Sequence, residues 1–386
     1  MRGGGDGADW PLRSSSGVSS PAGGRDTTED VAGETEVGGG GLSGVGLSGG
    51  GGDGGGSVSN KKQSLVKTLW EFSRPHTMIG TAVAIPAIGV FAGPPGVLPG
   101  RRFFLSMLWA MVPSLLINVF ITGLNQITDV EIDKVNKPYL PIPAGNLTSR
   151  AAKLTVMLCL LGGAVLGLAP CSLGSPGLSL TVVLSVLIGT VYSLPPLRLK
   201  RFPQVAALCI LVVRGSIING GFYSHAQLAG YGLSGEKTAL WALTLPFRDA
   251  KCALALAYFT VFAVVIALMK DVPDVAGDRM FNIPSFSVVL GEIKLFAFAR
   301  RLLTALLWST AAALGVGAKA AASASLPLTS GLRRVGVVSA LALITGQLVR
   351  RRAAGVDPEQ PKQVYDFYMY LWKIFYLSYL FLPLAR

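Results

Sequence analysis

Residues 118–147, NVFITGLNQITDVEIDKVNKPYLPIPAGNL, decide how the rest of the chain is interpreted. They overlap the end of an apolar run, residues 107–124, that is long enough to cross much of a bilayer. Asn125, Asp129 and Asp133 then follow at intervals of four residues, which places them on one face of a helix. A carboxylate at membrane depth costs roughly 2.5–3.5 kcal/mol on insertion scales. Two carboxylates and an amide on one stripe therefore indicate a bound cation.

A second acidic cluster follows about 140 residues later. The apolar run 253–269 ends in KDVPDVAGDR at residues 270–279, where Asp271, Asp274 and Asp278 are spaced by three and four residues. These spacings again favour one helix face, although Pro273 is expected to break or kink the helix. Each cluster ends a hydrophobic span, so we expect the two to face each other across one cavity.

The composition predicts an all-α, polytopic membrane protein. Hydrophobic residues make up 51% of the 386 residues and charged residues 14%, and the mean hydropathy is +0.52. About nine transmembrane helices are expected, in one membrane domain covering residues 58–386. The predicted helices centre near Ala87, Leu115, Leu161, Val186, Ile210, Phe262, Leu306, Leu341 and Leu377.

Residues 1–57 differ in kind from this domain. They are rich in Gly and Ser and lack apolar periodicity, which predicts a disordered tail. A plastid-targeting region is the alternative, although the eight acidic residues of the tail are unusual for a transit peptide. In the remainder, basic residues gather on the side of the two acidic motifs. By the positive-inside rule that side faces the cytosol, or the stroma or matrix of an organelle.

Two further features lie inside predicted spans. Arg214 and Asn219 stand among apolar residues, where polar side chains usually bind a ligand or pair with one another. The aromatic-rich segment 365–384 is interpreted as an interfacial belt, with the wall of a lipid-facing groove as the alternative.

Opposed aspartates beside basic residues suit one kind of ligand. Mg²⁺ prefers oxygen ligands and is often shared between carboxylates and substrate phosphates. Carboxylates that hold Mg²⁺, with Lys and Arg nearby, form a clamp for a diphosphate. A membrane cavity favours a diphosphate that carries a long hydrocarbon, and an allylic one ionises readily. The acceptor then needs an electron-rich carbon, as in a phenol, and no nucleic-acid partner is expected.

The two motifs, at the ends of spans two and six, resemble those of the UbiA-type intramembrane prenyltransferases over nearly all of residues 61–386. In that family the motif side chains bind Mg²⁺ and diphosphate. The resemblance implies metal ligation by Asn125, Asp129, Asp133, Asp271, Asp274 and Asp278, and catalytic roles for Asp129, Asp133, Asp274, Asp278 and Lys200. Substrate binding is expected from Arg74, His76, Lys134, Lys137, Tyr192, Arg198, Lys200, Arg201, Lys270 and Arg279. Many members have Asp where this chain has Gln126, which leaves the first motif one charge poorer.

Several segments resemble the plastid homogentisate prenyltransferases in particular. They include Arg74-Pro75-His76-Thr77 and the loop 136–141. The resemblance implies transfer of a prenyl group to homogentisate with loss of CO₂, in a chloroplast membrane with the motifs facing the stroma. Residues 196–203 and 214–219 look nearer the solanesyl branch, which gives a plastoquinone precursor, than the phytyl or geranylgeranyl branch of tocopherol synthesis.

The sequence has two alternative interpretations. A UbiA-type enzyme with a different aromatic acceptor would carry the same motifs. A membrane transporter would also contain intramembrane acids, but it is expected to bury isolated acids within broken helices. Here the acids are clustered at span ends beside basic loops, which favours the enzyme.

Overall fold

The computed structural model describes residues 63–233, 238–323 and 330–386, with side chains described outside 317–334. The predicted tail, residues 1–57, lies outside the described residues. The described part consists of helices and contains no strand, which confirms the all-α prediction. The α-helices are α1 Leu65–Phe72, α2 Pro75–Ala92, α3 Arg101–Thr128, α4 Val130–Asn136, α5 Ser149–Leu168, α6 Pro176–Ser193, α7 Pro203–Leu211, α8 Ile218–His225, α9 Ala239–Thr244, α10 Ala250–Asp271, α11 Val275–Met280, α12 Phe286–Leu290, α13 Glu292–Ser323, α14 Ser330–Ala354 and α15 Pro361–Phe381. Short 3₁₀ or π segments are η1 Leu199–Arg201, η2 Val212–Ile217, η3 Ala226–Gly230, η4 Leu245–Phe247 and η5 Leu382–Ala385.

Every predicted span centre falls in a long helical segment of the described chain. Six segments are long and apolar enough to cross a membrane: α2, α3, α5, α6, α10 and the composite Pro203–Gly230, which joins α7, η2, α8 and η3. The other three centres fall in α13, α14 and α15. The polytopic class is therefore confirmed, while a count of nine membrane spans stays a prediction.

Both acidic motifs lie where a long helix gives way to a short one. Asp129, with φ −118° and ψ 18°, separates α3 from α4, so the predicted single helix face from Asn125 to Asp133 is wrong at this joint. The break predicted at Pro273 is confirmed, because α10 ends at Asp271 and α11 begins at Val275. Asp271 thus ends the long helix α10, while the other motif carboxylates lie on non-helical backbone or on the short helix beyond it.

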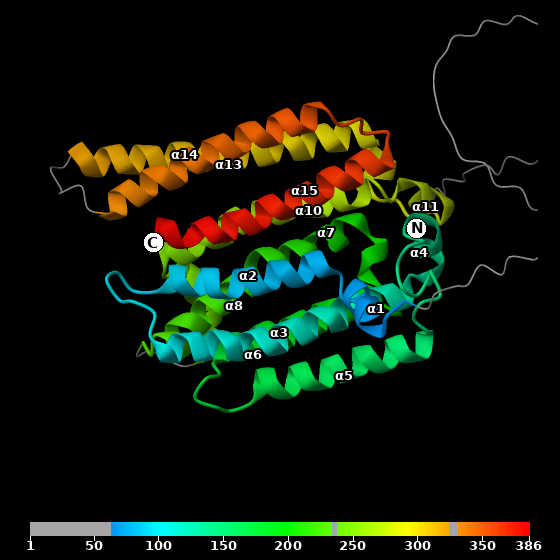
Figure 1. Ribbon diagram of the computed structural model, residues 1–386, viewed down its shortest axis with the longest axis horizontal. Coiled ribbons are helices and arrows are strands. Elements are labelled where there is room, and N and C mark those ends of the chain that lie inside the picture. Colours follow the sequence, from blue (N-terminus) through cyan, green and yellow to red (C-terminus); the bar gives the residue numbers. More distant parts are fainter. Residues whose placement is uncertain (1–62, 234–237, 324–329) are drawn as a thin grey trace, which may run out of the picture. The chain divides into compact units, whose positions relative to one another are not determined.

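Six long segments pack in a closed ring. Around the ring, α2 contacts α3, α3 contacts α6, and α6 contacts the composite Pro203–Gly230. That composite packs on α10, α10 packs on α15, and α15 returns to α2. Outside the ring, α5 packs on α3 and α6, while α13 packs on α10 and α14. The two short motif helices, α4 and α11, lie together at one end of the bundle (Figure 1).

The aromatic residues of α15 lie mainly inside the bundle. Trp372, Phe375 and Tyr379 are at most 3% exposed, and the ring of Tyr379 stacks on Phe259 of α10 with centroids 3.9 Å apart. The prediction of an interfacial belt is therefore wrong for these three side chains, because they fill the contact between α15 and its ring neighbours.

Candidate active site

The ring encloses a cavity of about 910 Å³ that both motifs line. One part, here called the charged end, contains ionisable and amide side chains. It comprises Asn125, Asp129, Asp133, Lys137, Arg198, Lys200, Lys270, Asp271, Asp274 and Asp278. A second part, here called the aromatic part, comprises His76, Arg214, Tyr368 and Trp372.

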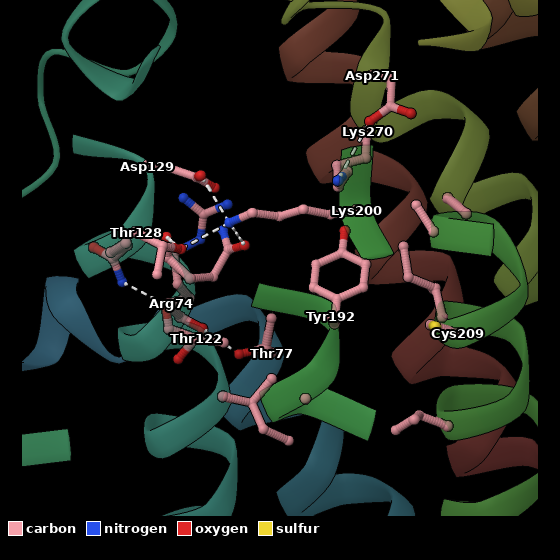
Figure 2. Close-up of a pocket in the computed structure, with 18 of the residues that line it drawn as sticks. Arg74, Thr77, Thr122, Thr128, Asp129, Tyr192, Lys200, Cys209, Lys270 and Asp271 are labelled. Atoms are coloured by element: carbon pink, nitrogen blue, oxygen red, sulfur yellow. Dashed lines mark hydrogen bonds and ion pairs between the residues drawn. The ribbon is translucent and has the colours of Figure 1, made fainter. Parts of the chain in front are cut away.

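The loop after α6 carries cations to the first motif. The Lys200 ammonium lies 2.7 Å from Oδ1 of Asp129, and the Arg198 guanidinium lies 3.1 Å from the same oxygen. Lys200 also donates to Oδ1 of Asn125 at 3.0 Å and to the hydroxyl of Thr128 at 2.8 Å. Figure 2 shows Lys200 between Asp129 and Thr128. Two motif residues and two cations from a distant loop therefore form one network.

The loop after α4 ties the first motif to the second. Nζ of Lys137 lies 2.5 Å from Oδ2 of Asp274. Asn136 accepts a hydrogen bond from the backbone N–H of Gly277 at 2.8 Å. A Cβ at position 277 would lie only 2.4 Å from Oδ1 of Asn136, so glycine allows this close approach. The two motifs, separated by about 140 residues in sequence, thus meet as predicted.

Two of the carboxylates are buried without a cation within 4.0 Å in the described chain. Asp133 is 6% exposed and Asp278 is 7% exposed. Burial raises the pKa of Asp133 to about 6, which the ammonium of Lys137 partly opposes. Burial likewise raises the pKa of Asp278 to about 6, against a hydrogen bond from Ser285. Such carboxylates are destabilised as anions and gain most from a metal ion.

Burial also affects the central cation of the first motif. It lowers the pKa of Lys200 below its ordinary value, and the neighbouring charge of Asp129 opposes this shift. Lys270, at the end of α10, pairs with Asp271 at 3.3 Å. Each cation of this end thus has a carboxylate partner that an incoming anion would share or replace.

The donor set of the charged end suits a hard divalent ion. Carboxylate and amide oxygens are the ligands that Mg²⁺ prefers, and Mg²⁺ commonly takes one or two carboxylates together with substrate phosphates and water. Within the described ranges, no three His, Cys, Asp or Glu side chains converge closely enough to hold one ion by themselves. The oxygen-rich set therefore fits an ion shared with a phosphorylated substrate, and not a site closed by protein ligands alone.

Most of the sequence-predicted site residues line this cavity, and two do not. The cavity-lining ones are Arg74, His76, Asn125, Asp129, Asp133, Lys137, Tyr192, Arg198, Lys200, Arg201, Lys270, Asp271, Asp274 and Asp278. Lys134 is exposed and pairs with Glu131 at 2.8 Å, and Arg279 is exposed and lies 3.8 Å from Glu292. Each directly follows an inward-facing aspartate, and neighbouring helix positions point in different directions. The structure therefore does not bring these two to the cavity, and their role in substrate binding stays a prediction.

Other contacts of the site were not assigned from the sequence. Gln126 is buried and donates to the backbone oxygen of Phe72 at 2.7 Å, so it fixes the end of α1 against α3. Asn118 hydrogen-bonds with Thr77 and Thr81 of α2, again between ring neighbours. The polar residue inside an apolar run was the available signal for both Asn118 and Gln126.

Comparisons with known proteins identify the family of this chain. The model of the "UbiA prenyltransferase family" matches residues 82–374. Homogentisate phytyltransferase 1 of Arabidopsis thaliana is 37% identical over 338 residues, which cover 85% of this chain and 78% of the relative. Homogentisate solanesyltransferase of the same plant is 37% identical over 317 residues, 81% of this chain and 75% of the relative.

Solved structures show the same fold. A UbiA homologue from Archaeoglobus fulgidus bound to GPP and Mg²⁺ is 15% identical, with a TM-score of 0.52, and the match covers 83% of this chain and all of that one. The same homologue bound to DMAPP and Mg²⁺ gives a TM-score of 0.51 at 14% identity. The matched family residues span both acidic motifs and the ring, which confirms the resemblance noted from the sequence. The chain belongs to the UbiA prenyltransferase family.

Proposed function

We propose that this protein transfers a prenyl group from a prenyl diphosphate to homogentisate, with loss of CO₂, in a Mg²⁺-dependent reaction. The observation that carries the proposal is the charged end of the cavity, where acids of both motifs meet cations of two loops. The 37% identity to plant homogentisate prenyltransferases supports the acceptor. Homogentisate phytyltransferase of Synechocystis is also 37% identical, over 83% of this chain.

The charged end binds the diphosphate of the donor. Lys200, Arg198, Lys137 and Lys270 supply cations, which form charge-assisted hydrogen bonds with phosphate oxygens. Mg²⁺, when bound, neutralises the diphosphate and makes it a better leaving group. The proposed ligands of the ion are Asn125, Asp129, Asp133, Asp271, Asp274 and Asp278.

The rest of the cavity favours carbon–carbon bond formation over hydrolysis. The allylic C–O bond breaks as diphosphate leaves, and an electron-rich ring carbon of homogentisate attacks the allylic carbon. The ring carbon then loses its proton, and the side-chain carbon that loses CO₂ takes up a proton. Apolar and aromatic walls such as Ile117, Phe222 and Trp372 keep water from the allylic cation.

For the donor we retain solanesyl diphosphate, on the resemblance of residues 196–203 and 214–219 to the solanesyl branch. Sequence identity does not favour solanesyl over phytyl diphosphate, because the phytyl and solanesyl transferases of Arabidopsis are both 37% identical to this chain. Homogentisate geranylgeranyltransferase of Triticum aestivum is 32% identical. Phytyl and geranylgeranyl diphosphate are therefore the alternatives that an assay must include.

We place the protein in a plastid membrane, with the motif side facing the stroma. Relatives from Arabidopsis and Oryza sativa are named chloroplastic, and six helices are suited to span a membrane. The stromal orientation rests on the basic residues beside the motifs. Residues 1–57 would form the targeting tail and 58–386 the enzymatic domain.

A second acceptor class has one specific observation in its favour. A coumarin 8-geranyltransferase of Citrus limon is 32% identical over 82% of this chain. A hydroxycoumarin offers an electron-rich phenolic ring but no arylacetate side chain. It therefore makes a sharp competitor in the functional test.

The test is a prenyl-transfer assay on the purified protein in detergent. Labelled homogentisate and a hydroxycoumarin are offered with solanesyl, geranylgeranyl or phytyl diphosphate, in Mg²⁺ or in EDTA. Release of CO₂ and a prenylated quinol only in Mg²⁺ is the expected result, with solanesyl diphosphate used best. Folded protein that prenylates the hydroxycoumarin and leaves homogentisate unchanged would contradict the proposed acceptor.

A further inference from the structure

Arg214 is a charged residue that the diphosphate site does not use. It belongs to the composite segment Pro203–Gly230, eleven residues beyond Pro203, and it lines the cavity beside Trp372. Within the described chain no carboxylate lies within 4.0 Å of its guanidinium, whereas Lys137, Lys200 and Lys270 each have one. A cation at membrane depth without a counter-ion is costly, so it indicates an anionic ligand.

The backbone around Arg214 is built to hold this position. Residues Val212–Ile217 form a π-helical segment, a distortion that is frequent at functional sites. Nδ2 of Asn219 donates to the backbone oxygens of Arg214 and Gly215 at 2.7 and 2.8 Å. The buried hydroxyl of Tyr379 donates to Oδ1 of Asn219 at 2.8 Å, which fixes the amide in turn.

Close packing against α10 adds to this support. A Cβ at Gly215 would lie 2.3 Å from Oγ1 and 2.7 Å from Cα of Thr260, so only glycine allows η2 to approach α10 this closely. The π-helical segment is therefore held by the hydrogen bonds through Asn219 and Tyr379, and by the close contact of Gly215 with the backbone of Thr260. The hydrogen bonds to the backbone of Arg214 and Gly215 thus account for the polar side chain of Asn219 in an apolar segment.

The guanidinium of Arg214 lies close to an aromatic ring of the cavity. Its Cζ lies 4.9 Å from the centre of the Trp372 ring, as in a cation–π contact. A guanidinium that uses its face for an aromatic ring keeps its N–H groups, which lie in its plane, for a carboxylate. The ring of His76 packs edge-on against Trp372, 5.0 Å away, and completes an aromatic wall beside the cation.

Resting on the proposed function, we propose that Arg214 binds the carboxylate of the aromatic acceptor, with its ring beside Trp372. Arg214 would thereby select aromatic acids over neutral phenols. Arg74 and Arg198 are less suited to this role. Arg198 is already paired with Asp129 at the charged end, and Arg74 lies at the entrance of α2.

The test measures binding and turnover with two acceptors, homogentisate and its methyl ester, which lacks the negative charge. Calorimetry on the full chain in detergent gives the affinity ratio of acid to ester. We expect the native protein to prefer the acid by about 30- to 100-fold, the scale of charge-assisted hydrogen bonds. Arg214→Met should remove this preference and raise KM for homogentisate by a similar factor, with KM for the prenyl diphosphate unchanged.

Two further variants separate recognition from folding. Arg214→Lys keeps the charge but loses the two-pronged geometry, so it should restore part of the acid preference. Lys251→Met removes another cation that lies over an aromatic ring, 5.1 Å from the centre of Phe91, outside the cavity lining. It should leave the acid preference as in the native protein.

The outcomes distinguish the subsite from the reaction. Arg214→Met protein that still prefers the acid by the native factor would overturn the subsite, while prenyl transfer by the native protein would leave the proposed function intact. A native protein that neither binds nor prenylates homogentisate would overturn both. Loss of donor affinity together with acid preference in Arg214→Met would assign Arg214 to folding of the cavity and also overturn the subsite.

Discussion

The charged end and the aromatic part of the cavity neutralise charge in opposite ways. At the charged end every cation of the described chain lies beside a carboxylate, and the carboxylates outnumber the cations. In the aromatic part Arg214 lies over Trp372 with no carboxylate within 4.0 Å in the described chain. A site with both positive and negative side chains suits a metal ion and a diphosphate together. A site with one uncompensated cation suits a small anion.

The largest expected effect comes from removing a carboxylate of the charged end. Asp274→Asn keeps the shape but deletes the charge that pairs with Lys137 and that we assign to the metal. We expect kcat/KM to fall by about 10²–10³-fold, the range for loss of one preorganised electrostatic contact. The acid-to-ester preference measured by binding should stay native, because Arg214 is untouched. Loss of that preference as well would mean that the two parts are not independent.

A pH series tests the charged end by itself. Burial raises the pKa of both Asp133 and Asp278 to about 6, so both gain protons as the pH falls from 7 to 5. The Mg²⁺ concentration for half-maximal activity should therefore rise steeply below pH 6. Acidification should have a favourable effect on folding when no metal is bound. The folded state binds these protons more readily than the unfolded chain, so thermal stability should rise as the pH falls from 7 to 5.

A matched pair of measurements checks that pH result. Thermal unfolding in EDTA is compared with unfolding in excess Mg²⁺ across the same pH range. Asp133→Asn should weaken the pH dependence of the Mg²⁺ requirement and that of thermal stability in EDTA. A Mg²⁺ requirement that does not change between pH 7 and pH 5 would contradict the assignment of Asp133 and Asp278 to the metal.

The smallest effects are expected just outside the cavity. Lys134→Met and Arg279→Met remove exposed cations whose ion-pair partners within the described residues are Glu131 and Glu292. Exposed ion pairs contribute little, so kcat/KM should stay within about twofold of the native value. The matched change Lys137→Met, three residues after Lys134, should lower it far more. Equal losses in Lys134→Met and Lys137→Met would place Lys134 at the diphosphate after all.

The sequence predicted the charged end well because its signal is local. Carboxylates spaced by three or four residues at the ends of apolar runs are too costly to lack a ligand, whatever the tertiary structure. The same local spacing was not enough to place Lys134, because direction around a seven-residue helix depends on which face meets α11. The helix break at Asp129 carries no proline or glycine signal, unlike the break at Pro273.

The aromatic part was only partly predictable. Arg214 stood out as a charge in an apolar run, but Trp372 lies 158 residues later and gives no hint of the contact. The aromatic residues of α15 were predicted to form a belt because composition reports their number and not the face that they share. Only the closure of the ring, with α15 packed on both α2 and α10, turns that face inward.

The hydrogen bond between Gly277 and Asn136 also has a consequence for biosynthesis. The chain emerges from the ribosome in order, so the first motif is made before Lys200 and long before Gly277 exist. Until Arg198 and Lys200 are made, Asp129 lacks the two cations that pair with it in the finished site. A product truncated before residue 198 would therefore leave Asp129 without these cations, and one truncated before residue 277 would leave Asn136 without its contact to the second motif. Such unpaired polar groups beside a membrane would distinguish a truncated chain from a complete one.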